Sequence, residues 1–228
     1  HTLVLEAPMA VLGAAIGLGT LFDWRVGLWL IFGGAYHYIG YGMNSYVDWK
    51  KGFDKDDERK QHHPLNTGEI KPDHAKYAIY GLLVGLLLFL FIMTFQQPKA
   101  LILSGVMVAS GMLYNYFGKY TSLKAIPISI AHTLVFFIPY YVYTEQVEHY
   151  VILVTAAYFI HHFYQISISG DIKDIDQDEA SLIQTLGATV YNNKCDGVDY
   201  LATSNKVLIM AYGLTIAQMF LAYMSMYI

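Results

Sequence analysis

The stretch NSYVDWKKGFDKDDERKQHHPLNTGEI (Asn44–Ile70) separates two long apolar runs of the chain. An uninterrupted apolar run of ~20 residues is long enough to cross a bilayer as a helix. The chain has 228 residues, of which 55% are hydrophobic and 14% are charged, whereas about a quarter of the residues of a soluble domain are charged. The sequence therefore predicts an all-α, polytopic transmembrane helical bundle, and the quoted stretch is one of its polar loops.

The apolar runs predict about seven membrane helices in a single domain that covers residues 1–228. Their expected ranges are 2–22, 26–47, 74–96, 99–118, 125–144, 149–170 and 205–228. Pro72 and Pro98 fit the starts of the third and fourth helices, where a missing N–H costs little. Pro139 lies inside the fifth range, where a proline is expected to kink the helix.

The loops between these helices alternate between the two faces of the membrane, and their positive charges are unequal. Of the 14 Lys and Arg residues, only Arg25 and Lys99 fall on the face with the short loops. Excess Lys and Arg marks the cytoplasmic side. We therefore expect a multi-pass protein of the cell membrane whose long loops, 48–73 and 171–204, face the cytoplasm.

The second predicted helix ends in a polar cluster on the face with the long loops. Asn44 and Asp48 are four residues apart, so their side chains share one face of the helix. His37 and Tyr41 continue that face toward the membrane centre. Gly52 is suited to end the helix, which would let the next carboxylate turn back toward the cluster.

The sixth predicted helix ends in a second cluster on the same side of the membrane. Asp171, Asp174 and Asp178 follow an i, i+3, i+7 pattern, which places them on one helical face. His161 and Tyr164 extend that face inward. Both clusters therefore combine carboxylates at the rim of the membrane with polar side chains below them.

Carboxylates packed in this way repel one another, and a bound divalent cation relieves the repulsion. Mg²⁺ takes oxygen ligands, commonly carboxylates together with substrate phosphates, and nearby lysines and arginines bind the remaining phosphate oxygens. A solvated loop of mixed charge is the simpler interpretation, and we adopt it for the run Asp56–Lys60. For the two one-faced clusters we favour a metal and diphosphate site, because ionisable groups at membrane spans are usually functional.

These motifs resemble those of the UbiA-type intramembrane prenyltransferases. Asn44 and Asp48 match the family's Asn-x-x-x-Asp motif after the second helix. The segment D171-I-K-D-I-D-Q-D178, followed by Thr185-Leu186, resembles the Asp-rich motif after the sixth helix. The spacing D48-W-K-K-G-F-D54 is most similar to the menaquinone branch of the family.

Two further segments carry the resemblance. L113-Y-N-Y-F-G-K-Y-T-S-L-K124 is similar to the family's middle Tyr-and-Lys motif, and H63-P-L-N-T-G-E-I70 is similar to its basic-Pro-Leu-x-x-Gly segment. The resemblance implies a helical bundle around a central cavity, in which Mg²⁺ ions on the Asp motifs bind a prenyl diphosphate. Loss of the diphosphate leaves an allylic carbocation, and a small acceptor attacks it.

The resemblance also implies roles for individual residues. The expected metal ligands are Asn44, Asp48, Asp54, Asp171, Asp174 and Asp178. The expected diphosphate-binding residues are Tyr114, Lys119, Lys124, Lys173 and Arg59. The residues expected to be catalytic are Asp48, Asp174 and Lys119. The acceptor cavity is expected to be lined by His37, Tyr41, His161 and Tyr164.

The sequence departs from the family pattern at several of these motifs. Ser45 follows Asn44 where an acidic or amide residue is usual, and His63 replaces the basic residue before Pro-Leu. Gly118 stands where the middle motif often has its lysine, and Leu182-Ile183 replaces a Gly-Lys pair. Each change removes positive charge or a ligand near the diphosphate. After residue 187 we expect a chain that is divergent, incomplete or joined across a gap.

Three functions remain open from the sequence. The first is Mg²⁺-dependent transfer of a prenyl group to an aromatic or lipid-precursor acceptor. The second is a non-catalytic UbiA-like subunit or lipid-binding scaffold of a larger membrane complex, which the lost positive charges favour. A cation transporter ranks last, because a transporter needs ionisable groups deep in the membrane, whereas the carboxylates of this chain cluster at one rim. No basic patch suggests a nucleic acid partner, and the single Cys195 excludes an internal disulfide.

Overall fold

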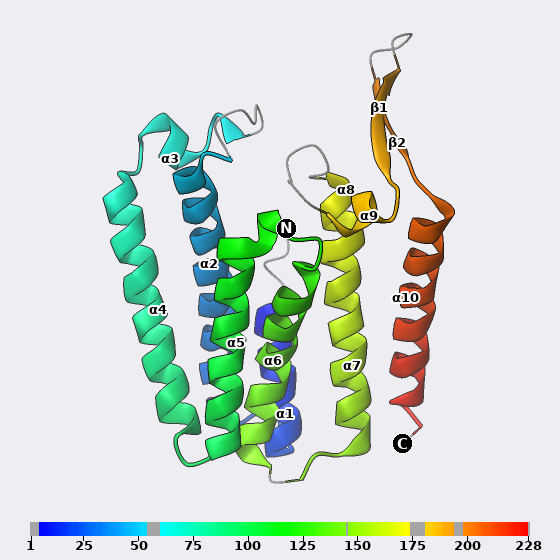
Figure 1. Cartoon of the computed structure of the whole chain (residues 1–228). Helices are drawn as coiled ribbons and strands as arrows, with labels where there is room; N and C mark the ends of the chain where they lie inside the picture. The colour runs from blue at the N-terminus through cyan, green and yellow to red at the C-terminus, as the bar shows by residue number, and fades with distance from the viewer. Residues whose placement is uncertain (1–4, 54–59, 145, 174–180, 194–197, 228) are drawn as a thin grey trace. The chain divides into compact units, whose positions relative to one another are not determined.

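The structure is a computed structural model that describes residues 5–53, 60–144, 146–173, 181–193 and 198–227 (Figure 1). Asp54, Arg59, Asp174 and Asp178 lie outside these residues. The chain divides into two compact units. The N-terminal unit comprises His1–Ala109 and Leu134–Gln146, and the C-terminal unit comprises Ser110–Thr133 and Val147–Ile228. Each unit is described by itself.

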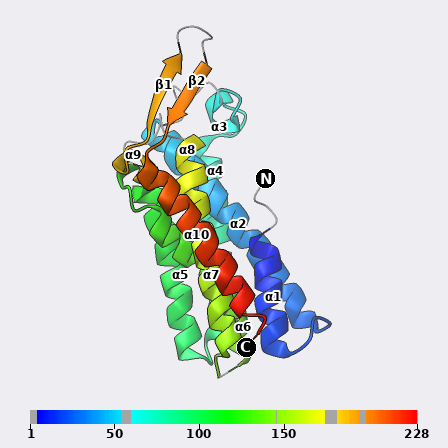
Figure 2. The same ribbon diagram turned by 90° about the vertical axis from the view of Figure 1, so that its right-hand side faces the viewer.

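The N-terminal unit is built from helices that pack on α2. Its elements are α1 (Glu6–Leu18), α2 (Trp24–Lys51), α3 (Pro64–Thr67), α4 (Pro72–Thr94), the first part of α5 (Pro98–Phe117) and the second part of α6 (Ala125–Tyr143). The long helix α2 packs against α1 and against α4 (Figures 1 and 2). α4 and α5 begin at Pro72 and Pro98, as the sequence predicts.

The C-terminal unit combines a helix pair with a small hairpin. Its elements are the end of α5, η2 (Gly118–Tyr120), the start of α6, α7 (His149–Tyr164), η3 (Gln165–Gly170), α8 (Asp171–Lys173), α9 (Leu182–Thr185), β1 (Thr189–Asn193), β2 (Val198–Ala202) and α10 (Asn205–Met224). Helices α7 and α10 pack side by side (Figure 2). The antiparallel hairpin pairs Thr189 with Ala202 and extends beyond the start of α10.

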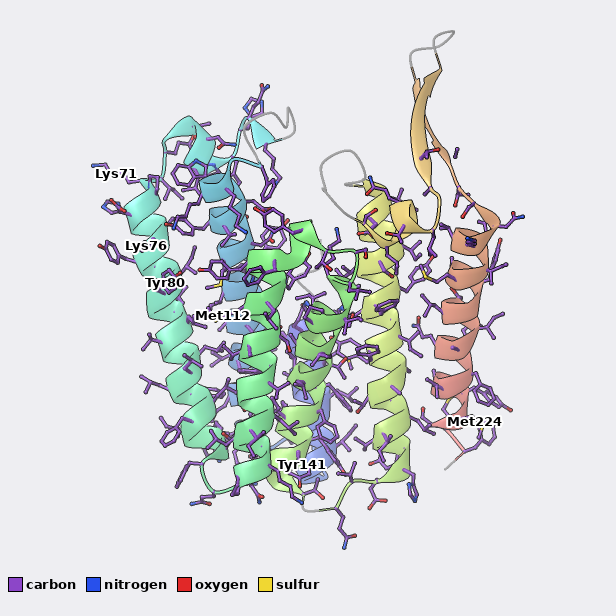
Figure 3. All side chains as sticks on the ribbon, viewed as in Figure 1. Lys71, Lys76, Tyr80, Met112, Tyr141 and Met224 are labelled. Atoms are coloured by element: carbon purple, nitrogen blue, oxygen red, sulfur yellow. The ribbon has the colours of Figure 1, made fainter. Side chains whose placement is uncertain are left out.

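Five of the described helices are long and apolar enough to cross a membrane. They are Pro72–Thr94, Pro98–Phe117, Ala125–Tyr143, His149–Gly170 and Asn205–Met224. Only 17% of the apolar span of α4 and 6% of that of α10 is buried inside the protein, so these two helices offer apolar surface to lipid on most sides. Figure 3 shows Lys71 and Lys76 at the polar end of α4, where both are exposed.

The helical bundle confirms the predicted fold class, whereas the count of seven spans is not confirmed. The predicted range 2–22 corresponds to α1, which has 13 residues and is shorter than a typical span. The second predicted span corresponds to α2, with 28 residues. Gly52 ends α2 with a positive φ of 83°, a backbone conformation that glycine adopts without strain, as predicted. The hairpin at Thr189–Ala202 was not predicted from the sequence.

Glycines allow close approach of backbones in the N-terminal unit. A Cβ atom added at Gly13 of α1 would lie 2.0 Å from the carbonyl oxygen of Phe136 in α6, and one at Gly17 would lie 2.6 Å from that of Tyr140. On α2, a Cβ at Gly33 would lie 2.6 Å from the Cα atom of Ala7. Small residues at such contacts let membrane helices pack by van der Waals attraction, so α1 is held on two sides by its glycine contacts.

A polar cluster lies at the start of α2. Asp23 caps the helix by accepting a hydrogen bond from the Arg25 backbone N–H, and its carboxylate pairs with the guanidinium at 2.7 Å. Hydrogen bonding from Arg25 lowers the pKa of Asp23 from 3.8 to about 2. The Arg25 guanidinium lies 5.2 Å from the ring centre of Tyr143, whose hydroxyl accepts a hydrogen bond from Trp29 Nε1 at 3.0 Å. This cluster connects the start of α2 with the end of α6.

The α1–α2 contact predicts opposite effects for two adjacent glycines of one helix. We expect Gly33→Ala to destabilise the protein by about 1–3 kcal/mol, because the methyl group would overlap backbone atoms of α1. Gly34→Ala is the control, since no atom lies within 4 Å of a Cβ there, and alanine favours helix formation. Thermal unfolding of both variants in detergent measures the difference, and equal melting temperatures would contradict the packing argument.

The Asp23 cap predicts a pH-dependent contribution to stability. Because the pKa of Asp23 is lower in the folded protein, its contribution is fully present above the ordinary value of 3.8 and disappears as the pH falls through about 2. We expect wild type to melt at a higher temperature than Asp23→Asn at neutral pH, with the two curves converging as the pH approaches 2. A difference that does not change with pH would show that the Asp23 charge is irrelevant.

Candidate active site

The first predicted motif forms a buried polar pair at the end of α2. The Asn44 side-chain amide donates a hydrogen bond to the Asp48 carboxylate at 3.2 Å, so the two residues share a helical face as predicted. Asp48 is only 3% exposed. Its backbone carbonyl also accepts hydrogen bonds from the N–H groups of Gly52 and Phe53, which close the helix end. The carboxylate is therefore fixed on a rigid element.

The second predicted motif begins at Asp171, the first residue of α8, which is 1% exposed. One carboxylate oxygen, Oδ1, pairs with the Lys124 ammonium at 2.8 Å. The other, Oδ2, accepts a hydrogen bond from the Leu182 backbone N–H at 2.9 Å. Asp171 therefore connects a motif lysine with the start of α9. Its hydrogen bond with Leu182 joins the residues that flank the segment carrying Asp174 and Asp178.

The middle motif places Gly118 close to both the Tyr114 ring and Lys124. A Cβ atom added at Gly118 would lie 3.4 Å from the Tyr114 ring and 3.6 Å from Lys124 Cβ. The position where the family often has a lysine is therefore adjacent to Lys124. The side chains of Lys119 and Lys173 lie outside the described part of the structure, so their diphosphate-binding roles stay predictions.

The segment after the second motif contributes to the hydrophobic core. Ile183, at the position of the family's lysine, is fully buried and packs with Ile168, Ala188 and Val207. A capping box between Ser181 and Gln184 fixes the short helix α9 around it. The loss of positive charge predicted from Leu182-Ile183 therefore has a structural counterpart, because an ammonium group could not replace this buried side chain without losing its solvation.

The four residues predicted to line the acceptor cavity contact different elements. His37 Nδ1 lies 3.2 Å from the carboxylate of Glu6 in α1, and its ring stacks on that of Tyr41, which is 67% exposed. In the C-terminal unit, His161 Nδ1 lies 3.2 Å from the Gln218 side-chain amide of α10. Tyr164 packs against the core formed by Ile168, Ile183, Ala188 and Val207. Their role in binding an acceptor stays a prediction.

A π-helical segment separates these inner residues from Asp171. The segment η3 spans Gln165–Gly170, and its i→i+5 hydrogen bonds change the rotation per residue. The expected common face of His161, Tyr164 and Asp171 assumed an uninterrupted α-helix. The three side chains instead contact α10, the Ile168 core and Lys124, respectively.

Two polar contacts between helices were not predicted. Glu6 is buried in the first turn of α1, where it pairs with His37. The rings of His132 in α6 and His162 in α7 stack with centres 4.4 Å apart, and the Tyr158 ring lies edge-on to His162. The sequence shows histidines within apolar runs, which is a signal of polar contacts there. It does not indicate which residues these histidines contact.

Within the described ranges, no group of three or more His, Cys, Asp or Glu side chains is arranged to hold a metal ion. Asp54, Asp174 and Asp178, half of the predicted ligand set, lie outside those ranges. The remaining three, Asn44, Asp48 and Asp171, supply amide and carboxylate oxygens, which are the ligand type that Mg²⁺ prefers. The chemistry of this donor set fits the ion.

Comparisons with known proteins agree with the fold and with the family resemblance. A structure described as the apo structure of a UbiA homolog from Aeropyrum pernix K1 is similar to this chain with a TM-score of 0.69 at 19% identity, covering 96% of this chain and 76% of that one. No curated protein matches the sequence significantly. The model of the UbiA prenyltransferase family matches residues 7–228, a range that includes the hairpin and α10 as well as the motifs. The chain therefore belongs to the UbiA prenyltransferase family, a family of intramembrane prenyltransferases.

Proposed function

We propose that the protein transfers an isoprenoid group from a prenyl diphosphate to a small acceptor in a Mg²⁺-dependent reaction. The observation that carries this proposal is the burial of two motif carboxylates, Asp48 in the last turn of α2 and Asp171 at the start of α8. A buried carboxylate is stable only with a compensating partner. Both carboxylates have partners from the predicted site, Asn44 for Asp48 and Lys124 for Asp171.

The proposed metal ligands are the oxygens of the two Asp motifs. Asn44, Asp48 and Asp171 would hold Mg²⁺ together with the carboxylates of Asp54, Asp174 and Asp178. When bound, the ion neutralises the negative charge that develops on the diphosphate leaving group. Asn44 has a second role in the described structure, since its amide orients the Asp48 carboxylate.

The proposed reaction breaks the bond between the prenyl carbon and the diphosphate oxygen, and both electrons stay on the oxygen. Lysine ammonium groups near the motifs, with the Tyr114 hydroxyl, stabilise this charge by hydrogen bonding. The allylic carbocation is attacked by the acceptor, which forms the new bond to the prenyl carbon and loses a proton. Water must be excluded from the cation, and the apolar helices around the motifs suit this requirement.

Lys124 is the proposed replacement for the lysine that the family often has at position 118. The two positions are neighbours, because a Cβ at Gly118 would contact that of Lys124. Lys124 lies with its ammonium against a motif carboxylate, so it is close to where the diphosphate would be held. Lys119 is the expected catalytic lysine, and Lys173 and Arg59 are the further candidates for binding the diphosphate.

The acceptor is an aromatic ring, as on a quinone pathway, or a lipid precursor. His37, Tyr41, His161 and Tyr164 are the proposed lining of its cavity. The motif loops are proposed to face the cytoplasm, because Lys71 and Lys76 mark one polar end of α4 (Figure 3), whereas Lys99 is the one lysine of the short loop after it.

A second candidate function is a non-catalytic subunit or lipid-binding scaffold in a larger membrane complex. Ile183 favours it, since a fully buried apolar residue stands where the family often has a lysine. The pairing of Lys124 with Asp171 is also compatible with a purely structural use of the motif. Copurification with other membrane subunits, without release of diphosphate, would support this second function.

The proposed metal site predicts a large loss of activity for neutral variants of the Asp motifs. We expect Asp48→Asn and Asp174→Asn to lower the rate of prenyl transfer from labelled geranylgeranyl diphosphate by about a hundredfold or more, because each removes a charge that stabilises the transition state. Asp73→Asn is the matched control, as Asp73 is an exposed carboxylate in the first turn of α4. Transfer at the wild-type rate in the motif variants would exclude the assignment.

The proposed role of Lys124 predicts that a lysine at the neighbouring position restores binding. We expect Lys124→Met to weaken binding of inorganic diphosphate with Mg²⁺ by about tenfold, and Gly118→Lys/Lys124→Met to regain most of the loss, because the second lysine restores the charge-assisted hydrogen bond. Isothermal titration in detergent measures the affinity. Gly118→Ala/Lys124→Met controls for the added side chain, and equal affinities of the two double variants would refute the replacement.

A further inference from the structure

Each oxygen of the Asp171 carboxylate already has a partner within the protein. Its Oδ1 receives the Lys124 ammonium at 2.8 Å and its Oδ2 the Leu182 N–H at 2.9 Å. The side chains of Lys124 and Asp171 are only 9% and 1% exposed. The proposed function, on which this inference rests, assigns both groups to other partners, namely diphosphate for Lys124 and Mg²⁺ for Asp171.

Burial makes it costly to separate the two groups without replacing both partners. Removing one member of a buried ion pair leaves the other charge without compensation, which typically costs several kcal/mol. A metal ion that took the Asp171 oxygen alone would leave the Lys124 ammonium in a poorly solvated position. A diphosphate that took Lys124 alone would leave the carboxylate in the same condition. When metal and diphosphate arrive together, each group exchanges one opposite charge for another.

We propose that Lys124 and Asp171 are exchange partners: each neutralises the other in the empty site, and they separate when Lys124 turns to the diphosphate and Asp171 to the metal ion. The exchange makes metal binding depend on the prenyl diphosphate, and the dependence is reciprocal. After the reaction, departure of the diphosphate restores the Lys124–Asp171 pair and releases the ion. The Leu182 contact through Oδ2 keeps Asp171 in place during the exchange, because it leaves only Oδ1 to change partner.

A purely structural ion pair has different consequences. It would hold the segment before α6 against the start of α8 in every state, and Lys124 would remain protected whether or not ligands are present. The exchange instead requires the ammonium to change its surroundings twice during ligand binding. Chemical reactivity of the lysine distinguishes the two possibilities.

The first experiment measures labelling of Lys124 in the full chain by a small amine-reactive reagent, with mass spectrometry. We expect slow labelling in the empty protein, faster labelling by about threefold or more at high Mg²⁺ concentration as the metal competes for Asp171, and slow labelling with Mg²⁺ and inorganic diphosphate together. Lys71, which is exposed at the start of α4, is the internal control and should label equally in all states. Uniformly slow labelling of Lys124 would overturn the proposal.

The second experiment measures Mn²⁺ affinity by electron paramagnetic resonance in the absence of diphosphate. We expect Lys124→Met to bind Mn²⁺ about tenfold more tightly than wild type, because the variant lacks the ammonium that competes with the metal for Asp171. Lys124→Arg keeps the charge and should match wild type. Equal or weaker Mn²⁺ binding by folded Lys124→Met would contradict the exchange, and if that variant does not fold, the labelling pattern of wild type decides.

The same measurements separate this inference from the proposed function. Wild type that binds Mg²⁺ and diphosphate together, with Lys124 protected throughout, would retain the proposed function and exclude the exchange. Wild type that binds neither ligand would exclude both.

Discussion

A buried carboxylate needs a partner that compensates its charge, and the partners of Asp171 determine how several elements of the C-terminal unit are connected. One oxygen pairs with the Lys124 ammonium, just before α6, and the other accepts a hydrogen bond from the backbone N–H of Leu182, at the start of α9. One side chain thereby connects the start of α8 with the start of α9 and with Lys124, which lies 47 residues earlier in the chain. Ile183, directly after the anchored N–H, enters the core with Ile168 and Val207, so the polar contact and the apolar packing stabilise the same arrangement.

The membrane imposes a different constraint on the helices themselves. Lipid tails are as apolar as the protein interior, so the hydrophobic effect does not drive helices together within the membrane. Contact between membrane helices therefore depends on close packing. Gly13, Gly17 and Gly33 provide it in the N-terminal unit, where α1 approaches its neighbours at backbone distance. α4 and α10, largely exposed to lipid, satisfy their backbone hydrogen bonds internally and need no such contacts over most of their length.

The sequence predicts the helical bundle well, because runs of apolar residues and helix-starting prolines act locally. Pro72 and Pro98 begin their helices, and Gly52 ends α2. The hairpin at Thr189–Ala202 was not predicted, because strand formation depends on side-chain context more than helix formation does. The predicted range 2–22 extends past the end of α1, because Leu21 and Phe22 continue the apolar run after Gly19 has ended the helix.

Prediction of the site succeeds within a helix and fails between elements. The Asn44–Asp48 contact follows from spacing alone, whereas the partners of Glu6 and His162 depend on how helices pack, which a single sequence does not encode locally. The face shared by His161, Tyr164 and Asp171 could not be predicted either, because η3 changes the helical rotation between them. A π-helical turn leaves no simple compositional signal in the segment Gln165–Gly170.

The departures from the family pattern have a combined effect on the number of positive charges at the proposed site. Ile183 and Gly118 each stand where the family often has a lysine, whereas Lys124 lies in contact with the motif carboxylate of Asp171. In a family whose substrate is a diphosphate, a site with fewer cations holds the leaving group less tightly unless the remaining one is released to it. The Lys124–Asp171 pair supplies such a cation without leaving a positive charge unbalanced in the empty protein. A non-catalytic scaffold does not require Lys124 to leave Asp171, whereas the proposed enzyme does. Release of this ammonium group therefore distinguishes an active enzyme from a structural relative.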